Sequence, residues 1–243
     1  MNMVNIDKYP ERWVAYFDLL GFKNLLNDHK KDPQFILEIY NDVLKELDTS
    51  ENQNLRKKKI LDYCWFSDTF LIWSENNDEH CFCNLEKATF CFFTGLLENM
   101  VPVRGAIGYG PFYADKAQSI YIGQALIDAY QYTENQQWLN YVFTPNTTDK
   151  MQKVGIAPQK LLKYAPIPAD LKNKIYSDNN LRKGIVYAFT YSADDTLGNY
   201  IFNYINNMKR ECKSKRQRDI QKYENSLSWL EMQKKKWVDI QKK

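Results

Sequence analysis

The amino-acid sequence predicts an α+β protein with a ferredoxin-like βαββαβ core, in which an antiparallel sheet carries its helices on one face. The main observation is the order of the apolar patterns, which alternate between strand-like and helix-like spacing as β-α-β-β-α-β. A second observation is the chain after about residue 196, which has a long helical pattern and no proline. We therefore expect one domain over residues 1–195 and a basic helical extension over residues 196–243.

The first half of the predicted core is a strand, a helix and a hairpin. The first strand is placed at residues 12–19, and Pro33 opens a helical pattern that ends near Asp48. The polar residues 49–59 predict a loop. Residues 60–73 are strand-like on both sides of Ser67 and Asp68, so we expect a hairpin that turns there.

The second half begins with an apolar helix, predicted over residues 81–99. Residues 101–113 predict a strand rich in glycine, where another backbone or a ligand can approach closely. A helix over residues 122–138 is expected to begin just after Gly123, and short strands are predicted at residues 141–145 and 184–191.

The C-terminal extension is predicted as one long basic helix. Residues 209–243 contain twelve Lys or Arg against five acidic residues, and apolar residues recur among them in a broken heptad-like pattern. Two interpretations stay open. The helix either docks on the domain or on a partner, or it binds nucleic acid or another anionic surface through its basic side.

Composition is that of an ordinary globular protein, with 44% hydrophobic and 26% charged residues. The net charge of +3 does not by itself indicate nucleic-acid binding. The sequence has no run of about 18 apolar residues and no apolar signal core at its start, so we expect a cytoplasmic protein without membrane contact. The five cysteines form no C-x-x-C pair, and His80, Cys81 and Cys83 fit no standard zinc spacing, which favours plain thiols.

Three charged residues have positions that suggest a site. Asp18 ends the first strand and Asp68 lies at the hairpin turn, and a ferredoxin-like sheet makes these elements neighbours. Two converging carboxylates repel each other unless a divalent cation lies between them. Arg104, inside the glycine-rich strand, needs an anion, and the turn at Gly21 could present N–H groups to a phosphate. Taken singly, Asp18 is explained at least as well as a helix cap, Asp68 is an ordinary turn residue, and for Arg104 a structural ion pair is favoured over a ligand contact.

Four segments resemble the class III nucleotidyl (adenylate/guanylate) cyclases. FDLLGF at residues 17–22 is similar to their F-D-x-x-G-F motif, and FSDTFLIW at residues 66–73 resembles the hairpin with their second metal aspartate. VRGAIGYG at residues 103–110 is similar to their R-x-G-x-x-x-G strand, and residues 121–134 resemble their later glycine and helix. The residues in these motifs are most similar to those of short bacterial cyclases, including the pyrimidine (uridylate/cytidylate) cyclases of the Pycsar antiphage system.

The resemblance implies a catalytic domain over residues 1–195 that converts a nucleoside triphosphate, UTP or CTP, to the 3′,5′-cyclic monophosphate and pyrophosphate. It implies that Asp18, the Leu19 carbonyl and Asp68 hold two Mg²⁺ or Mn²⁺ ions. The N–H groups of Gly21 and Phe22 and the side chain of Arg104 would bind the triphosphate. In this family the sites lie between two subunits, so a homodimer is expected. Nucleic acid is not among the main partners that we expect.

The sequence departs from the family pattern at three places. The family's helix asparagine and arginine correspond to Ile127 and Gln131, so the transition-state arginine is missing or comes from elsewhere. Arg182 and Lys183 are candidates that no motif supports.

The third departure lies at the family's purine-selecting lysine, which falls near Cys64, and Tyr63 and Cys64 are expected to contact the base. Two alternatives follow from these departures and from the tail: a degenerate cyclase-like domain that signals by binding nucleotide, or a scaffold that acts through its basic tail.

Overall fold

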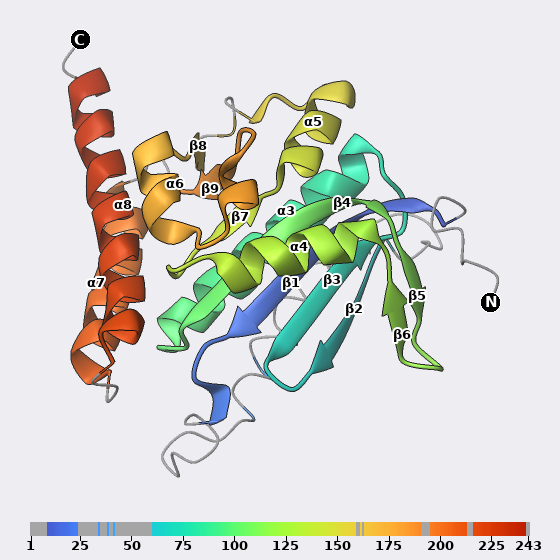
Figure 1. Ribbon diagram of the computed structural model, residues 1–243, viewed down its shortest axis with the longest axis horizontal. Helices are drawn as coiled ribbons and strands as arrows, with labels where there is room; N and C mark the ends of the chain where they lie inside the picture. Colours follow the sequence, from blue (N-terminus) through green and yellow to red (C-terminus); the bar gives the residue numbers. More distant parts are fainter. Residues whose placement is uncertain are drawn as a thin grey trace.

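The computed structural model describes residues 9–23, 60–158, 163–190, 195–212 and 216–241, and positions 34, 38, 41 and 161. Seven strands form one sheet in the order β2-β3-β1-β4-β7-β9-β8 (Figure 1). The first four are β1 (Glu11–Leu19), β2 (Leu61–Phe66), β3 (Thr69–Ser74) and β4 (Val103–Pro111), and neighbours among them run antiparallel. Their order is the ferredoxin-like one, so the predicted α+β class is confirmed.

β1 is an interior strand of the sheet, and its residues 13–17 are all buried. A strand that is covered on both faces has no polar alternation, and the run WVAYF has none. β1 pairs with β3 on one side and β4 on the other, in a register that places Asp18 opposite both Thr69 and Arg104. The predicted hairpin is confirmed as β2 and β3, which turn at Ser67 and Asp68.

Most of the helix predicted over residues 33–48 and the whole loop predicted over residues 49–59 lie outside the described residues. Three positions of that helix are described, Gln34, Glu38 and Asn41, and all three are helical and exposed.

Helices cover both faces of the sheet, and the expectation of helices on one face was wrong. α3 (Glu79–Glu98) packs on the face that carries Phe17, whose ring lies 5.1 Å from that of Phe92. α4 (Gln124–Asn135) lies on the opposite face, where Tyr130 contacts Tyr16 edge to face at 5.6 Å. Gly108 permits this close packing, because a Cβ there would lie 2.2 Å from the carbonyl oxygen of Ala125.

The second half of the sheet is mixed. β7 (Tyr141–Phe143) runs parallel to β4, with α4 as the connection between them, so the sheet is not wholly antiparallel. β7 and β9 (Tyr187–Phe189) confirm the two short strands predicted from the sequence, although both are shorter than expected. The glycine-rich strand ends at Pro111 and is followed by a hairpin of β5 (Tyr113–Asp115) and β6 (Ile120–Ile122).

Four further elements have no counterpart in the sequence prediction. They are α5 (Pro145–Lys153), β8 (Tyr164–Pro166), α6 (Ala169–Ile175) and the short 3₁₀ helix η3 (Asn179–Arg182). β8 is the strand at the far edge of the sheet and pairs with β9.

The C-terminal extension is two helices, and the prediction of one long helix was wrong. α7 (Asp195–Glu211) and α8 (Gln217–Gln241) lie side by side (Figure 1), and they are antiparallel because Lys209 pairs with Glu224 while Lys234 contacts Asn199. The reversal allows apolar residues of both helices to be buried. This burial stabilises the fold more than the extra backbone hydrogen bonds of one continuous helix would. The buried apolar side chains are Ile201, Ile205, Met208, Tyr223, Trp229 and Leu230.

α8 docks on the rest of the chain. Trp229 is fully buried, contacts the ring of Trp138 at 5.7 Å and donates its indole N–H to the Phe189 carbonyl at 2.8 Å. The division of the chain at residue 195 stays a prediction. Within the described ranges, no helix has the length and apolar character needed to cross a membrane.

Candidate functional site

The structure brings Asp18 and Asp68 to the same end of the sheet. Asp18 is the last polar residue of β1, and its register partner on β3 is Thr69, the residue after Asp68. The N–H of Leu19 donates to the Asp68 carbonyl at 2.8 Å, which fixes the hairpin turn against the end of β1. Ser67, in the turn, has the left-handed φ of 55°, so the chain reverses tightly and Asp68 stays half-buried beside β1.

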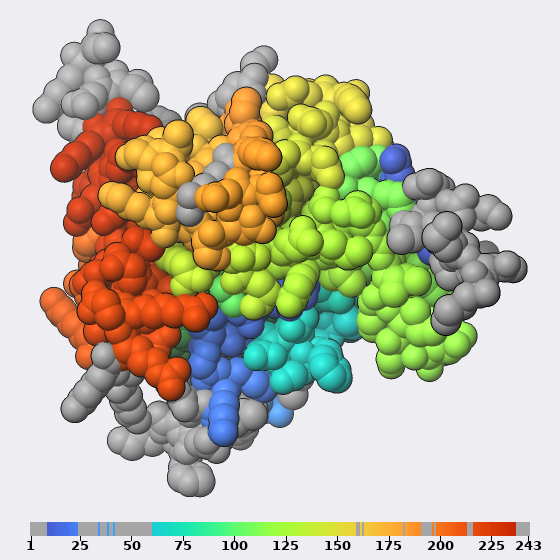
Figure 2. Space-filling view, viewed as in Figure 1, coloured from blue at the N-terminus to red at the C-terminus, as the bar shows by residue number. Residues whose placement is uncertain are grey.

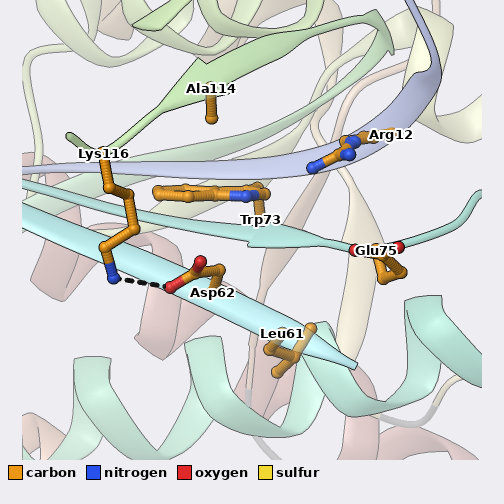
Figure 3. A pocket seen from close by; sticks show the side chains of 7 residues that line it. All are labelled: Arg12, Leu61, Asp62, Trp73, Glu75, Ala114 and Lys116. Carbon is orange, nitrogen blue, oxygen red and sulfur yellow. Dashed lines mark hydrogen bonds and ion pairs between the residues drawn. The ribbon is translucent and has the colours of Figure 1, made fainter. Parts of the chain in front are cut away.

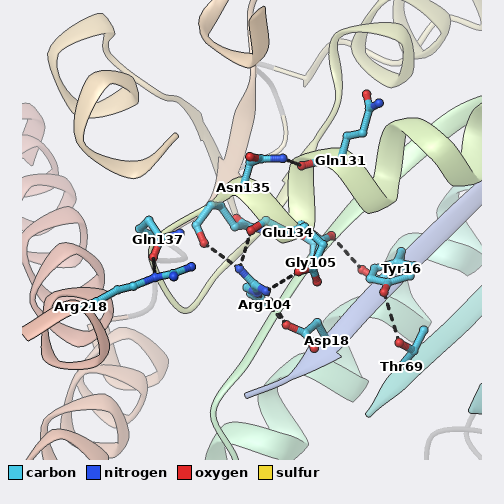
Figure 4. Close-up of polar contacts among 12 residues, drawn as sticks. Tyr16, Asp18, Thr69, Arg104, Gly105, Gln131, Glu134, Asn135, Gln137 and Arg218 are labelled. Atoms are coloured by element: carbon cyan, nitrogen blue, oxygen red, sulfur yellow. Dashed lines mark hydrogen bonds and ion pairs between the residues drawn. The ribbon is translucent and has the colours of Figure 1, made fainter. Parts of the chain in front are cut away.

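Arg104 is buried, with 6% of its surface exposed, and it donates four hydrogen bonds to protein acceptors (Figure 4). Nε donates to Asp18 Oδ2 at 2.7 Å, and Nη2 forms an ion pair with the same oxygen, also at 2.7 Å. Nη2 also donates to the Glu134 carboxylate at 3.0 Å, and Nη1 donates to the carbonyls of Glu134 and Gln136 at 2.8 and 3.1 Å. Each of the three guanidinium nitrogens of Arg104 is thus engaged by the protein, where the sequence predicted a phosphate contact. Its contacts instead fix Asp18 and the end of α4.

The turn after Asp18 has the geometry of a strand-to-helix bend. The N–H groups of Leu19 and Leu20 are used by the carbonyls of Asp68 and Pro102, each at 2.8 Å. Gly21 has φ +73°, and Phe22 begins a helical turn. No backbone acceptor among the described residues pairs with the N–H groups of Gly21 and Phe22. Their position, at a strand-to-helix bend, is one that suits an anion.

The oxygen atoms at this end of the sheet fit a hard divalent cation. Asp18 uses one carboxylate oxygen for Arg104, and no described residue donates to the other. No hydrogen bond or ion pair joins the Asp68 side chain to another described residue, and Leu19, whose carbonyl is the third predicted ligand, directly follows Asp18 at the end of β1. Carboxylate and carbonyl oxygens are the ligands that Mg²⁺ and Mn²⁺ prefer.

The His80–Cys83 segment does not form a similar site. All of it lies on α3, where Cys81 is buried while His80 and Cys83 are exposed. Within the described part of the chain, no three or more His, Cys, Asp or Glu side chains gather where they could hold a metal.

Tyr63 and Cys64 point to opposite faces of β2, because neighbours along a strand alternate. Cys64 pairs with Leu71, which pairs with Tyr16, so its thiol shares the face of Asp18. Burial raises the pKa of the Cys64 thiol, which hydrogen-bonds Tyr121. Tyr63 lies on the α3 face, where its ring is parallel to that of Phe70. The two residues predicted to contact the base therefore do not converge.

A small cavity lies on the hairpin, away from Asp18 (Figure 3). Its volume is about 240 Å³, and it is lined by Arg12, Leu61, Asp62, Trp73, Glu75, Ala114 and Lys116. Lys116 pairs with Asp62 at 2.8 Å and lies 4.7 Å from the centre of the Tyr63 ring. This cavity is a surface feature with its own ion pair and contains none of the predicted site residues.

Two of the positions that depart from the family pattern are exposed. Ile127 and Gln131 lie on the outer side of α4, with Ile127 42% exposed. Arg182 ends η3, and Lys183 follows it as an exposed residue whose ammonium lies 3.5 Å from Asn180 Oδ1.

Sequence reasoning missed Tyr16 and Glu134. Tyr16 shares the face of Asp18, and burial raises the pKa of its hydroxyl to about 12, while a hydrogen bond with Thr69 opposes that rise. Glu134 lies in the last turn of α4 and supplies two acceptors to Arg104. The signal for Tyr16 was available, since it lies two residues before Asp18 on one strand. Glu134 is near Arg104 only because α4 crosses the sheet.

Sequence reasoning also missed Lys222 on α8, which was counted only as one charge of a basic tail. Lys222 is half-buried, and burial lowers the pKa of its ammonium. The charge of Arg104 lowers that pKa further, while Asp219 and Asp18 oppose the change. α8 is therefore close enough to the Asp18–Arg104 pair for their charges to interact.

No protein-family model matches the chain, and no curated protein matches it. Among solved structures, it is similar to the monomeric and the non-canonical dimeric guanylyl cyclase domains of the RhoGC fusion protein from the aquatic fungus Blastocladiella emersonii. The monomeric domain shares 14% identity with this chain, covers 74% of this chain and 95% of its own, and has a TM-score of 0.40. The dimeric domain shares 13% identity, covers 74% of this chain and 96% of its own, and has a TM-score of 0.44. The catalytic core of a rhodopsin-guanylyl cyclase with converted specificity, in complex with ATPαS, shares 13% identity, covers 74% of this chain and 95% of its own, and has a TM-score of 0.42.

Proposed function

We propose that the protein is a nucleotidyl cyclase that converts a nucleoside triphosphate, UTP or CTP, to its 3′,5′-cyclic monophosphate and pyrophosphate. The observation that carries this proposal is the placement of Asp18 and Asp68 together at one end of the sheet, with one oxygen of Asp18 held by Arg104 and the other unused. The sequence resemblance to cyclases of antiphage systems supports a role as a second-messenger synthase in such defence.

Each site residue has a proposed role. Asp18, Asp68 and the Leu19 carbonyl would hold two Mg²⁺ or Mn²⁺ ions, which would supply charge neutralisation and activation of the 3′-hydroxyl. The N–H groups of Gly21 and Phe22 would bind the triphosphate. Arg104 keeps the Asp18 carboxylate in place, and Cys64, on the same face, is the better placed of the two candidates for contact with the base.

We further propose a homodimer with the site at its interface. Apolar side chains are exposed on β6 and α4 around this face: Ile120 (38%), Ile122 (42%), Ile127 (42%) and Tyr130 (49%). Both elements lie on the side of the molecule that Figure 2 shows. Such side chains in one neighbourhood are typical of a protein–protein contact. An Ile127→Asp variant should run as a monomer in size-exclusion chromatography with light scattering, whereas the unaltered protein should run as a dimer.

The test of the activity is product analysis. Purified protein is incubated with each of the four ribonucleoside triphosphates and Mn²⁺, and cyclic monophosphates are detected by mass spectrometry. Cyclic UMP or CMP is expected from the unaltered protein and from Asp62→Asn, which changes an acid on the same hairpin away from the site. Asp68→Asn should form no product while its circular dichroism spectrum stays unchanged. Turnover that survives in Asp68→Asn would refute the two-metal proposal.

A second function has a specific observation in its favour. Exposed Ile127 and Gln131 stand where related helices carry catalytic side chains, which fits a domain that binds nucleotide and signals without turnover. Nucleotide binding that depends on Asp18, with no cyclic product from any base, would select this alternative.

A further inference from the structure

The N-terminal half of α8 packs beside the Asp18–Arg104 pair. Asn225 Nδ2 donates to the Gln137 carbonyl at 2.7 Å, and the Leu139 N–H donates to Ser226 Oγ, also at 2.7 Å. The adjacent Gln136 carbonyl is one of the acceptors of Arg104. The short connection between α4 and β7 therefore touches α8 on one side and the guanidinium of Arg104 on the other.

Arg218 and Lys222 lie on this same side of α8, because residues four apart share a helix face with Ser226. Arg218 extends from α8 toward the connection, and its Nε lies 3.4 Å from Gln137 Oε1 (Figure 4). Lys222 is one turn further along, between Arg218 and Ser226, and is half-buried.

The ammonium of Lys222 has no acceptor among the described residues. The nearest carboxylates of the site, those of Asp18 and Glu134, are both engaged by Arg104. Another lysine of the same helical pair is different, since Lys209 has Glu224 at 3.0 Å. Burial of the Lys222 charge is costly, and Arg104 and Arg218 nearby add repulsion, which the acids Asp219 and Asp18 offset only in part. An anion that enters between them would remove both penalties.

We propose that Lys222, together with Arg218, binds the phosphate groups of the substrate beside Asp18, as same-chain cations that make the contact predicted for Arg104, whose nitrogens are engaged by the protein. The identity of the anion as a triphosphate rests on the proposed function. α8 is then a wall of the active site and not only a docking helix.

The test is isothermal titration of inorganic triphosphate, in the presence of Mg²⁺, into the full-length protein and its variants. Lys222→Met keeps the length of the apolar stem and removes the charge, and Arg218→Met is the second variant. Lys235→Met, exposed on the same helix, is the matched control. We expect Lys222→Met to weaken binding roughly tenfold or more, as for a lost charged hydrogen bond, and the control to bind as the unaltered protein does.

A thermal melt separates this role from a structural one. Lys222→Met should melt at the same temperature or higher, because the substitution removes an unpartnered charge, whereas loss of a structural ion pair would lower the melting temperature. Equal triphosphate affinity in Lys222→Met and Lys235→Met would overturn the proposal, as would a failure of the unaltered protein to bind triphosphate. Affinity that depends on Lys222, without any cyclic product, would support this inference and contradict the cyclase proposal alone.

Discussion

Replacement of Arg104 by methionine should destabilise the protein strongly. The substitution leaves Asp18, whose side chain is 13% exposed, without its ion pair, and it removes the donors of two main-chain carbonyls at the end of α4. Loss of one partner from a buried ion pair costs about 3–5 kcal/mol. Unfolding free energies of small domains are about 5–15 kcal/mol, so the loss is a large share of the total.

The assay is urea unfolding followed by circular dichroism, with Lys116→Met as the control. Lys116 also loses one acidic partner, Asp62, but these side chains are 45% and 28% exposed, and exposed pairs contribute about 1 kcal/mol or less. Arg104→Lys, which keeps the charge but has three donors in place of five, should lie between the two. A loss in Arg104→Met no larger than that in Lys116→Met would refute the structural role of Arg104.

Three further substitutions test the packing around the site. Gly108→Ala should lower the unfolding free energy by about 1–3 kcal/mol through overpacking, since its Cβ would lie 2.2 Å from the Ala125 carbonyl oxygen; an unchanged urea midpoint would contradict the close approach of α4. Ser226→Ala should cost about 1–3 kcal/mol in the same assay, because the buried N–H of Leu139 loses its acceptor; a loss below that range would show that water replaces the hydroxyl. Burial raises the pKa of Tyr132 to about 12 from 10.0, so its contribution to stability is complete below pH 10 and is lost as the pH rises to about 12. Tyr132→Phe should therefore show a smaller fall in melting temperature over that interval, and equal curves for the two proteins would exclude the effect.

The sequence predicted the elements whose signals are local. Alternation and turn chemistry placed the hairpin at Ser67 and Asp68, and Gly123 marked the start of α4. The convergence of Asp18 and Asp68 followed from the strand order alone, since neighbouring strands bring their ends together. These predictions needed no knowledge of how distant segments pack.

The features that sequence reasoning missed depend on tertiary packing. The face on which α4 lies, and so the contact between Glu134 and Arg104, is set by the crossover from β4 to parallel β7. The reversal between α7 and α8 has no proline or glycine to mark it, because burial of Trp229 and its neighbours selects it. In the sequence, Lys222 is one charge among many in a basic segment. Only the packing of α8 beside Asp18 and Arg104 distinguishes it.

The docking of α8 has a consequence for how the chain matures during synthesis. Trp229 completes the corner around Trp138 and Phe189, and Ser226 satisfies the Leu139 N–H across 87 residues of sequence. A nascent chain that has not yet emerged as far as Trp229 leaves this corner apolar and open, with a main-chain donor unpaired. The domain therefore completes its folding only after α8 has been made, and a nascent chain that stops before α8 would expose an incomplete intermediate to aggregation and proteolysis.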